Sequence, residues 1–204
     1  MARLVNRLVL FFARHWLALV NSVLALVLGL AFLAPWLMLH SQTGVGALLY
    51  WAYQPVCHQL PERSFFLGGP QPWYSFAELT GHLGYEAPAR FVGNLGLGYK
   101  VALCERDTAI YAGWLLAGLV YGLFRGRVRQ LPWQWLVILG LPMAVDGLLQ
   151  FFGVLESTWW RRTATGLLFA VGVIWFAFPL LEWGMKDACE IAWRSQEETR
   201  AGDR

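Results

Sequence analysis

The sequence predicts an all-α integral membrane protein with four transmembrane helices plus an extracytoplasmic interfacial helix and loop. Hydrophobic residues make up 57% of the chain and charged residues only 14%, a balance too apolar for a soluble domain of 204 residues. The mean hydropathy of +0.46 agrees. Four apolar stretches also approach or exceed the roughly 20 residues that a helix needs to cross a bilayer.

These stretches are the predicted transmembrane helices, at residues 16–39, 101–124, 131–151 and 165–181. The first is longer than the apolar core of a cleaved signal peptide, and no small-residue cleavage site follows it, so we expect it to remain in the protein. The whole chain, residues 1–204, is then a single integral membrane domain. Its polar end, residues 195–204, is expected to be a mobile tail.

The segment 40–100 is the longest connection, and we expect it to lie on the membrane because it has too few apolar residues for a core of its own. Apolar residues recur at helical spacing before Pro55, which predicts an interfacial helix ending near that proline. Further on, Ser75 and Glu78 form a capping-box pattern for a short helix through about Thr80.

Basic residues indicate the orientation, because cytoplasmic loops are enriched in lysine and arginine. They precede the first predicted helix, fill the turn between the second and third, and follow the fourth: Arg3, Arg7, Arg14, Arg125, Arg127, Arg129, Lys186, Arg194 and Arg200. Both termini are therefore expected in the cytoplasm of a multi-pass protein of the cell (inner) membrane. The segment 40–100 and the turn 153–162 then lie outside.

Polar residues beside the apolar stretches are the strongest functional signal, because polar chemistry is expensive near lipid. The block Cys-His-Gln-Leu-Pro-Glu-Arg-Ser-Phe occupies residues 57–65, and Cys-Glu-Arg-Asp at 104–107 opens the second helix. Asp146 lies in the outer half of the third helix, with Gln150 one turn later. The predicted topology brings all of these groups to the external face.

These blocks resemble an uncharacterised family of small multi-spanning prokaryotic membrane proteins of unknown function. The resemblance rests on Cys-His-Gln-x-Pro-x-Arg-Ser-Phe at 57–65, on Cys-x-Arg-Asp-x-Ala-Ile-Tyr at 104–111, and on a proline, Asp-Gly, arginine and threonine pattern within 142–166. Many similar proteins carry a second cysteine where this chain has Asp107. The resemblance implies a membrane fold and no particular activity.

A metal site is one interpretation of the two cysteines. Cys57, His58, Cys104 and Asp107 offer the thiolate, imidazole and carboxylate groups that suit zinc, and a tetrahedral site needs about four of them. Cys104 and Asp107 share a helical face at i and i+3. His82 is a substitute ligand, and the spacing matches no known zinc signature.

Two other interpretations remain open. An oxidising external face permits a disulfide between Cys57 and Cys104, which would tie the external loop to the second helix. The chain would then be a non-catalytic membrane subunit or assembly factor. A reactive thiol is the third, with the pKa of Cys57 lowered by His58 or Arg63.

Three further residues are candidates for catalysis. In the metal interpretation Arg106 and Arg162 orient an anionic headgroup, and Asp146 acts as a base or holds a ligand in place, on a lipid or other amphipathic anionic substrate. An ion pair between Arg106 and Asp146 explains those two residues equally well. Arg161 is explained by contact with lipid phosphates. Whether the protein is an enzyme stays open at this stage, as do its substrate, reaction and ion.

Several classes are excluded. The chain has no glycine-rich phosphate loop, no Gly-x-Ser-x-Gly elbow, no His-Glu-x-x-His helix and no Cys-x-x-Cys-His haem site. Nucleic acid is not an expected partner, because the basic residues are few and flank the apolar stretches. The expected partners are the lipid bilayer and either another membrane protein or further copies of this chain.

Overall fold

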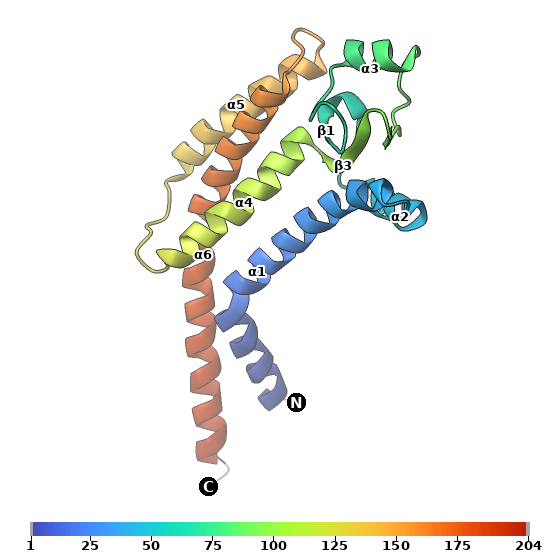
Figure 1. Ribbon diagram of the computed structural model, residues 1–204. Coiled ribbons are helices and arrows are strands. Elements are labelled where there is room, and N and C mark those ends of the chain that lie inside the picture. The colour runs from blue at the N-terminus through green and yellow to red at the C-terminus, as the bar shows by residue number, and fades with distance from the viewer. Residues whose placement is uncertain (1, 203–204) are drawn as a thin grey trace.

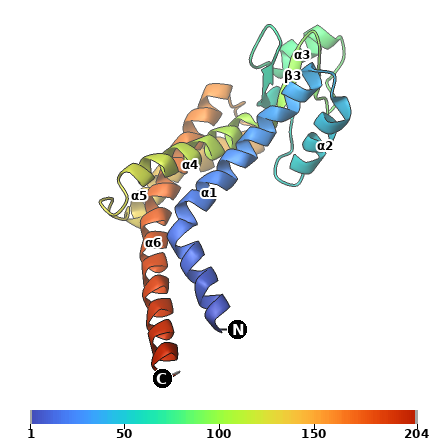
Figure 2. The same cartoon turned by 60° about the horizontal axis from the view of Figure 1, so that its bottom comes forward.

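Long helices extend from a small sheet-containing region at one end of the molecule, and both termini lie at the other end (Figure 1). A computed structural model describes residues 2–202 of the chain. The four long helices are α1 (Ala2–Leu39), α4 (Glu105–Leu123), α5 (Trp133–Phe151) and α6 (Trp159–Gly202). In the second view the termini again lie together, away from the sheet (Figure 2).

The helices pack mainly around α6, which contacts α4, α5 and α1. Small residues allow the closest approach, since a Cβ added at Gly113 of α4 would lie 2.6 Å from the Cβ of Ala170 on α6. A Cβ at Gly166 would lie 3.1 Å from the carbonyl oxygen of Arg106. Close contact between small residues is how helices associate where lipid removes the hydrophobic driving force.

Three helical segments are long and apolar enough to cross a membrane: Leu4–Leu39, Trp133–Phe151 and Trp159–Ser195. They contain the predicted stretches 16–39, 165–181 and nearly all of 131–151. The remaining predicted stretch, 101–124, is not among them within the described residues. Its helix, α4, starts later and has Glu105, Arg106 and Asp107 in its first turn.

The connection between α1 and α4 departs from the all-α prediction, because it contains a three-stranded antiparallel sheet. It comprises α2 (Thr43–Tyr53), η1 (Pro61–Arg63), β1 (Ser64–Leu67), α3 (Phe76–Leu83), β2 (Gly93–Asn94) and β3 (Gly98–Cys104). The strand order is β1-β3-β2, so β3 is central. Residues 101–103 were assigned to a helix and instead form this strand, since a short apolar run suits a buried strand equally well.

The expectation that this region lacks a core is also wrong. Phe66, Tyr74, Leu79 and Leu97 form a buried cluster between the sheet and α3. The Phe66 and Tyr74 rings meet edge to face with centroids 5.0 Å apart, and the Tyr74 hydroxyl donates to the carbonyl oxygen of Leu97 at 3.0 Å. A few large side chains, two of them aromatic, therefore form a hydrophobic core that the number of apolar residues did not predict.

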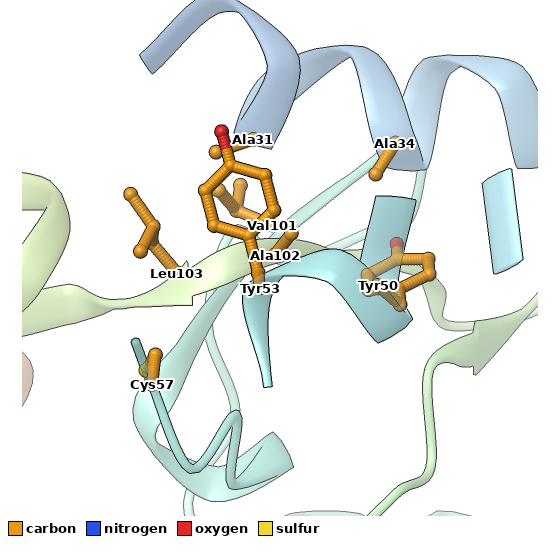
Figure 3. Close-up of a cluster of buried hydrophobic side chains, with 8 residues drawn as sticks. All are labelled: Ala31, Ala34, Tyr50, Tyr53, Cys57, Val101, Ala102 and Leu103. Atoms are coloured by element: carbon orange, nitrogen blue, oxygen red, sulfur yellow. The ribbon is translucent and has the colours of Figure 1, made fainter. Parts of the chain in front are cut away.

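A second cluster fastens this region to α1 (Figure 3). Its buried members are Ala31, Ala34, Tyr50, Tyr53, Cys57, Val101, Ala102 and Leu103. They come from α1, α2, the loop after α2 and β3. Cys57 is thus held against a packed apolar surface beside the end of β3.

The smaller predictions have mixed outcomes. The capping box at Ser75 and Glu78 is present, and α3 continues past Thr80 to Leu83. The helix expected near Pro55 is α2, and its position on the bilayer surface stays a prediction. Residues 195–202 of the expected tail belong to α6, and residues 203–204 lie outside the described part.

Candidate functional site

The junction between β3 and α4 brings the two cysteines of the polar blocks together. Cys104 is the residue that precedes the first turn of α4, and its side chain accepts from the backbone N–H of Asp107 at 3.4 Å. The N–H of Cys104 itself donates to Cys57 Sγ at 3.2 Å. Both sulfur atoms therefore accept a backbone N–H at the start of α4, a contact that by itself favours the thiolate.

Asp107 completes a group of three potential metal ligands. One ligand atom from each of Cys57, Cys104 and Asp107 lies within 4.8 Å of the others. Cys104 Sγ is 3.2 Å from Asp107 Oδ2. Ligand atoms around a tetrahedral zinc ion lie about 3.3–3.8 Å apart, so a shift of about 1 Å would suffice to close the group on an ion.

His58 does not join this group. Its side chain is exposed, and the chain turns at Gln59, whose φ is +54°. The buried Gln59 side chain donates to the carbonyl oxygen of Tyr50 at 2.7 Å. The neighbouring imidazole therefore stays at the surface, and the predicted set of four ligands is reduced to three.

His58 still lines the same cavity as the three potential ligands. This cavity, which we call the thiol cavity, has a volume of about 420 Å³. Its lining includes Cys57, His58, Gln59, Arg63, Cys104, Arg106, Asp107, Gln150 and Arg162. The predicted convergence of distant polar residues is thus found for most of the candidates.

All three cysteines, Cys57, Cys104 and Cys189, are free thiols in the structure. The alternative disulfide is therefore not formed, although Cys57 and Cys104 are neighbours. A hydrogen bond from the Cys104 thiol lowers the pKa of Cys57 below its usual value, and burial opposes this. The same contact, followed by burial, raises the pKa of Cys104. Cys57 is accordingly the thiol that ionises first.

Lys100 is a buried cation beside this site that the sequence did not indicate. Its side chain is fully buried, and its Nζ donates to the carbonyl oxygen of Gln59. Burial lowers its pKa from 10.5 to about 8, although the charges of Cys57 and Glu62 act in the opposite direction. Among the described residues no carboxylate lies within salt-bridge distance of Lys100.

This burial predicts that Lys100→Met stabilises the protein at neutral pH. Below pH 8 the amine is charged in both folded and unfolded chains, so the folded chain carries a desolvation cost of about 3 kcal/mol. Loss of the hydrogen bond to the carbonyl oxygen of Gln59 destabilises the variant by about 1 kcal/mol and offsets part of this gain. We therefore expect a net gain of about 2 kcal/mol in the free energy of unfolding at pH 7.

The pH dependence provides the check. Between about pH 8 and 10.5 the folded amine loses its proton before the unfolded one, so the wild-type protein should gain stability as pH rises. Lys100→Met should lack that rise in a titration of the unfolding midpoint. Lys186→Met, at an exposed position, is the control and should behave as wild type. A Lys100→Met protein less stable than wild type at pH 7 would contradict the prediction.

Asp146 is buried in a cluster with two arginines. Its Oδ2 lies 2.5 Å from Arg106 Nη2 and accepts from the Ser157 hydroxyl at 2.7 Å, and its Oδ1 lies 3.0 Å from Arg161 Nη2. The expected pairing with Arg106 is confirmed, and Arg161 contacts the same carboxylate, a partner that the sequence interpretation did not assign to it. Two hydrogen-bond donors and a second guanidinium group surround Asp146, and it lines neither the thiol cavity nor the cavity described below, so it is poorly suited to act as a base.

Arg162 is paired with a residue that the sequence interpretation missed. Its Nη1 lies 2.8 Å from Glu105 Oε2, and both side chains are buried. A further contact of 3.5 Å joins Arg162 Nη1 to the carbonyl oxygen of Glu62. One feature of the sequence could have indicated a buried partner for Glu105. This residue lies between Cys104 and Arg106 at the start of an apolar helix, where an unpaired carboxylate is costly.

A second cavity lies between the sheet region and the start of α6. We call it the tryptophan cavity, and its volume is about 710 Å³. Residues from η1, the segment before α3, the start of α4 and the α5–α6 connection line it, with Trp73, Trp159 and Trp160 among them. Trp73 and Trp159 lie with ring centroids 6.2 Å apart.

Comparisons with known proteins agree with a membrane protein. A family model described as "Predicted membrane protein (DUF2085)" matches residues 95–176. The "Uncharacterized protein MJ1492" of Methanocaldococcus jannaschii is 28% identical over 174 residues, which cover 82% of this chain and 92% of the archaeal protein. No solved structure matches the chain. These similarities support an uncharacterised family of membrane proteins.

Proposed function

We propose that this membrane protein crosses the bilayer four times and presents its sheet region and both cavities on the extracytoplasmic side of the cell membrane. The arrangement of α4 supports the fourth crossing. From the sheet region α4 runs in the direction of the termini, and the turn before α5 lies beside the middle of α6 (Figures 1 and 2). Three crossings would leave the termini on opposite sides. Basic residues at the terminal end favour the cytoplasm there.

The function that we propose is binding of a zinc-like ion in the thiol cavity, next to a site for an anionic lipid headgroup or a similar amphipathic group. The observation that carries it is the convergence of Cys57, Cys104 and Asp107 within 4.8 Å, from a loop and a helix start far apart in sequence. Two thiolates and a carboxylate suit zinc, and three protein ligands leave a position open for another group.

The arginines supply the second half of the proposal. Arg106 and Arg162 line the same cavity as the three ligands, and each has a buried Nε–H without an acceptor among residues 2–202. A guanidinium group is the preferred partner of phosphate and carboxylate. A bound ion would act as a Lewis acid on an anionic group held by these arginines.

Metal content of the purified full-length protein tests the proposal. We expect about one zinc ion per chain and, after exchange with cobalt, a thiolate charge-transfer band in the near ultraviolet. Cys57→Ser and Cys104→Ser should each lower affinity by more than the 10- to 100-fold that outer-shell changes produce. Cys189→Ser is the matched control, because the third cysteine lies outside the ligand group, and its affinity should be unchanged.

Thiol titration of the same samples gives the opposing results. Metal-free protein whose two thiols react freely would overturn the metal site. Circular dichroism of the serine variants distinguishes loss of ligands from loss of folding. Asp107→Asn keeps the size of the third ligand and should weaken binding without removing the charge-transfer band.

A non-catalytic subunit or assembly factor is the second candidate. The contact between the Cys104 N–H and Cys57 Sγ at 3.2 Å supports it, since oxidation of these neighbouring thiols would join the external loop to α4. A Cys57–Cys104 disulfide found by mass spectrometry without reductant would favour this candidate over the metal site.

A further inference from the structure

The thiol cavity and the tryptophan cavity share part of their walls. Arg63, Gln150 and Arg162 line both, and the volumes are about 420 Å³ and 710 Å³. The residues of the shared wall come from η1, the end of α5 and the start of α6. The two cavities are therefore neighbouring chambers of one cleft at the external ends of the membrane helices.

In the thiol cavity two arginines keep hydrogen-bond donors that are free within the described residues, although Asp107 also lines it. Arg106 and Arg162 each leave a buried Nε–H without an acceptor in the described part of the chain. Arg106 and Arg161 share the single carboxylate of Asp146, so that group carries one positive charge in excess. An unpaired buried donor is costly, and a phosphate group offers the acceptors and the charge that these groups lack.

The tryptophan cavity carries a carboxylate without an ion-pair partner among the described residues. Three carboxylates line it, and two of them already have partners: Glu105 pairs with Arg162, and Glu62 lies 3.8 Å from Arg63. The third, Glu156, has no ion pair within residues 2–202. This side of the cleft therefore retains one uncompensated negative charge.

The aromatic groups beside Glu156 suit a cation. Trp73 and Trp159 line the same chamber, with their ring planes inclined by 32°. Aromatic faces attract ammonium groups, most strongly where water is partly excluded. A carboxylate together with tryptophan faces is a combination that recognises an alkylammonium ion.

The position of the cleft favours a lipid over a soluble ligand. The cleft lies where α5 ends and α6 begins, the depth at which headgroups meet the hydrocarbon layer in the four-span arrangement. Leu155 and Trp160 in its lining are also exposed, and Phe152 next to them is exposed as well. Exposed aromatic and aliphatic groups at that depth contact acyl chains while the headgroup enters the cleft.

We propose that the cleft binds the headgroup of a zwitterionic phospholipid with a primary ammonium group. The phosphate lies against Arg106 and Arg162, and the ammonium group lies against Glu156, Trp73 and Trp159. The inference rests on the proposed function and names its substrate class. Among the phosphate-bearing headgroups of the proposed function, Glu156 favours those that also carry a cation, because an only anionic headgroup places no positive charge beside the carboxylate.

Competition between short-chain lipids tests the inference on purified full-length protein in detergent. Dioctanoyl phosphatidylethanolamine should bind about tenfold more tightly than dioctanoyl phosphatidylglycerol, measured by native mass spectrometry or by the thermal midpoint. Inorganic phosphate alone should bind more weakly than either lipid. Equal affinity for the two lipids, a preference for phosphatidylglycerol, or equally strong binding of phosphate would each overturn it.

Variants test whether the tryptophan cavity causes the preference for phosphatidylethanolamine. Glu156→Gln and Trp73→Leu should each reduce the tenfold preference for phosphatidylethanolamine over phosphatidylglycerol. Glu86→Gln, an exposed glutamate outside the linings of both chambers, is the matched control and should keep the preference. A preference that survives Glu156→Gln would contradict the proposed ammonium position.

Repeating the competition after chelation separates this inference from the metal site. A preference for phosphatidylethanolamine that persists without metal supports the cleft even if the ion proposal fails. Zinc binding without any lipid preference would support the metal site alone and would overturn the inference that the cleft binds a zwitterionic headgroup.

Discussion

Replacing Asp146 with asparagine is expected to destabilise the protein by about 3–5 kcal/mol. The carboxylate is buried and neutralises part of the charge of Arg106 and Arg161, so its loss leaves two guanidinium groups without a counter-charge. Asparagine retains the size of the side chain and an acceptor for Ser157. The loss therefore reports the missing charge, measured as the free energy of unfolding by SDS titration in mixed micelles.

Two companion variants make the result specific. Arg161→Gln should have an effect of about 1 kcal/mol, because Arg161 is about a quarter exposed and Asp146 keeps Arg106 as its partner. The double variant Asp146→Leu with Arg106→Met should be more stable than Asp146→Asn alone, since it removes the charge left buried. A loss below about 1 kcal/mol for Asp146→Asn would contradict the ion-pair interpretation.

Gly98→Ala is expected to have a similarly large effect, about 3–5 kcal/mol, by breaking the sheet that carries the site. The φ of Gly98 is +82°, a conformation that alanine adopts only under strain. An added Cβ would also lie 2.4 Å from the carbonyl oxygen of Leu67 in the adjacent strand. Backbone atoms cannot move aside as a flexible side chain does, so the pairing of β1 with β3 must shift.

The readout is the unfolding midpoint together with the reactivity of Cys57, which packs against β3 and should become accessible when the sheet opens. Gly81→Ala is the matched control. Gly81 lies within α3 with no atom near an added Cβ, so alanine should be neutral or stabilise by up to about 1 kcal/mol. A Gly98→Ala protein with wild-type stability would show that the sheet does not have this close packing.

The sequence predicted which residues lie close together in the candidate site, but only some of the contacts between them. Its three candidate ligand residues lie in polar blocks that stand out against apolar surroundings. The exclusion of His58 follows from the turn at Gln59, where a positive φ separates neighbouring side chains. No periodic pattern in a sequence marks such a turn for a residue other than glycine.

The fold shows the same division. Helices α1, α5 and α6 follow from apolar length alone, and α3 follows from its capping box. The sheet was missed because β3 holds a run of apolar residues that continues directly into the helix α4. Burial on both faces removes the alternation that identifies a strand, so only pairing with β1 and β2 distinguishes it from one more helical turn.

By itself the sequence determined that this is an apolar, mostly helical membrane protein and which polar blocks lie beside its helices, because hydrophobicity and capping act between residues a few positions apart. Tertiary structure alone decided the partners. Arg106 meets Asp146 across 40 positions, Cys104 meets Cys57 across 47, and Arg162 meets Glu105 across 57. The physical reason is that buried charges and thiols take whichever complementary group the packed helices bring within reach.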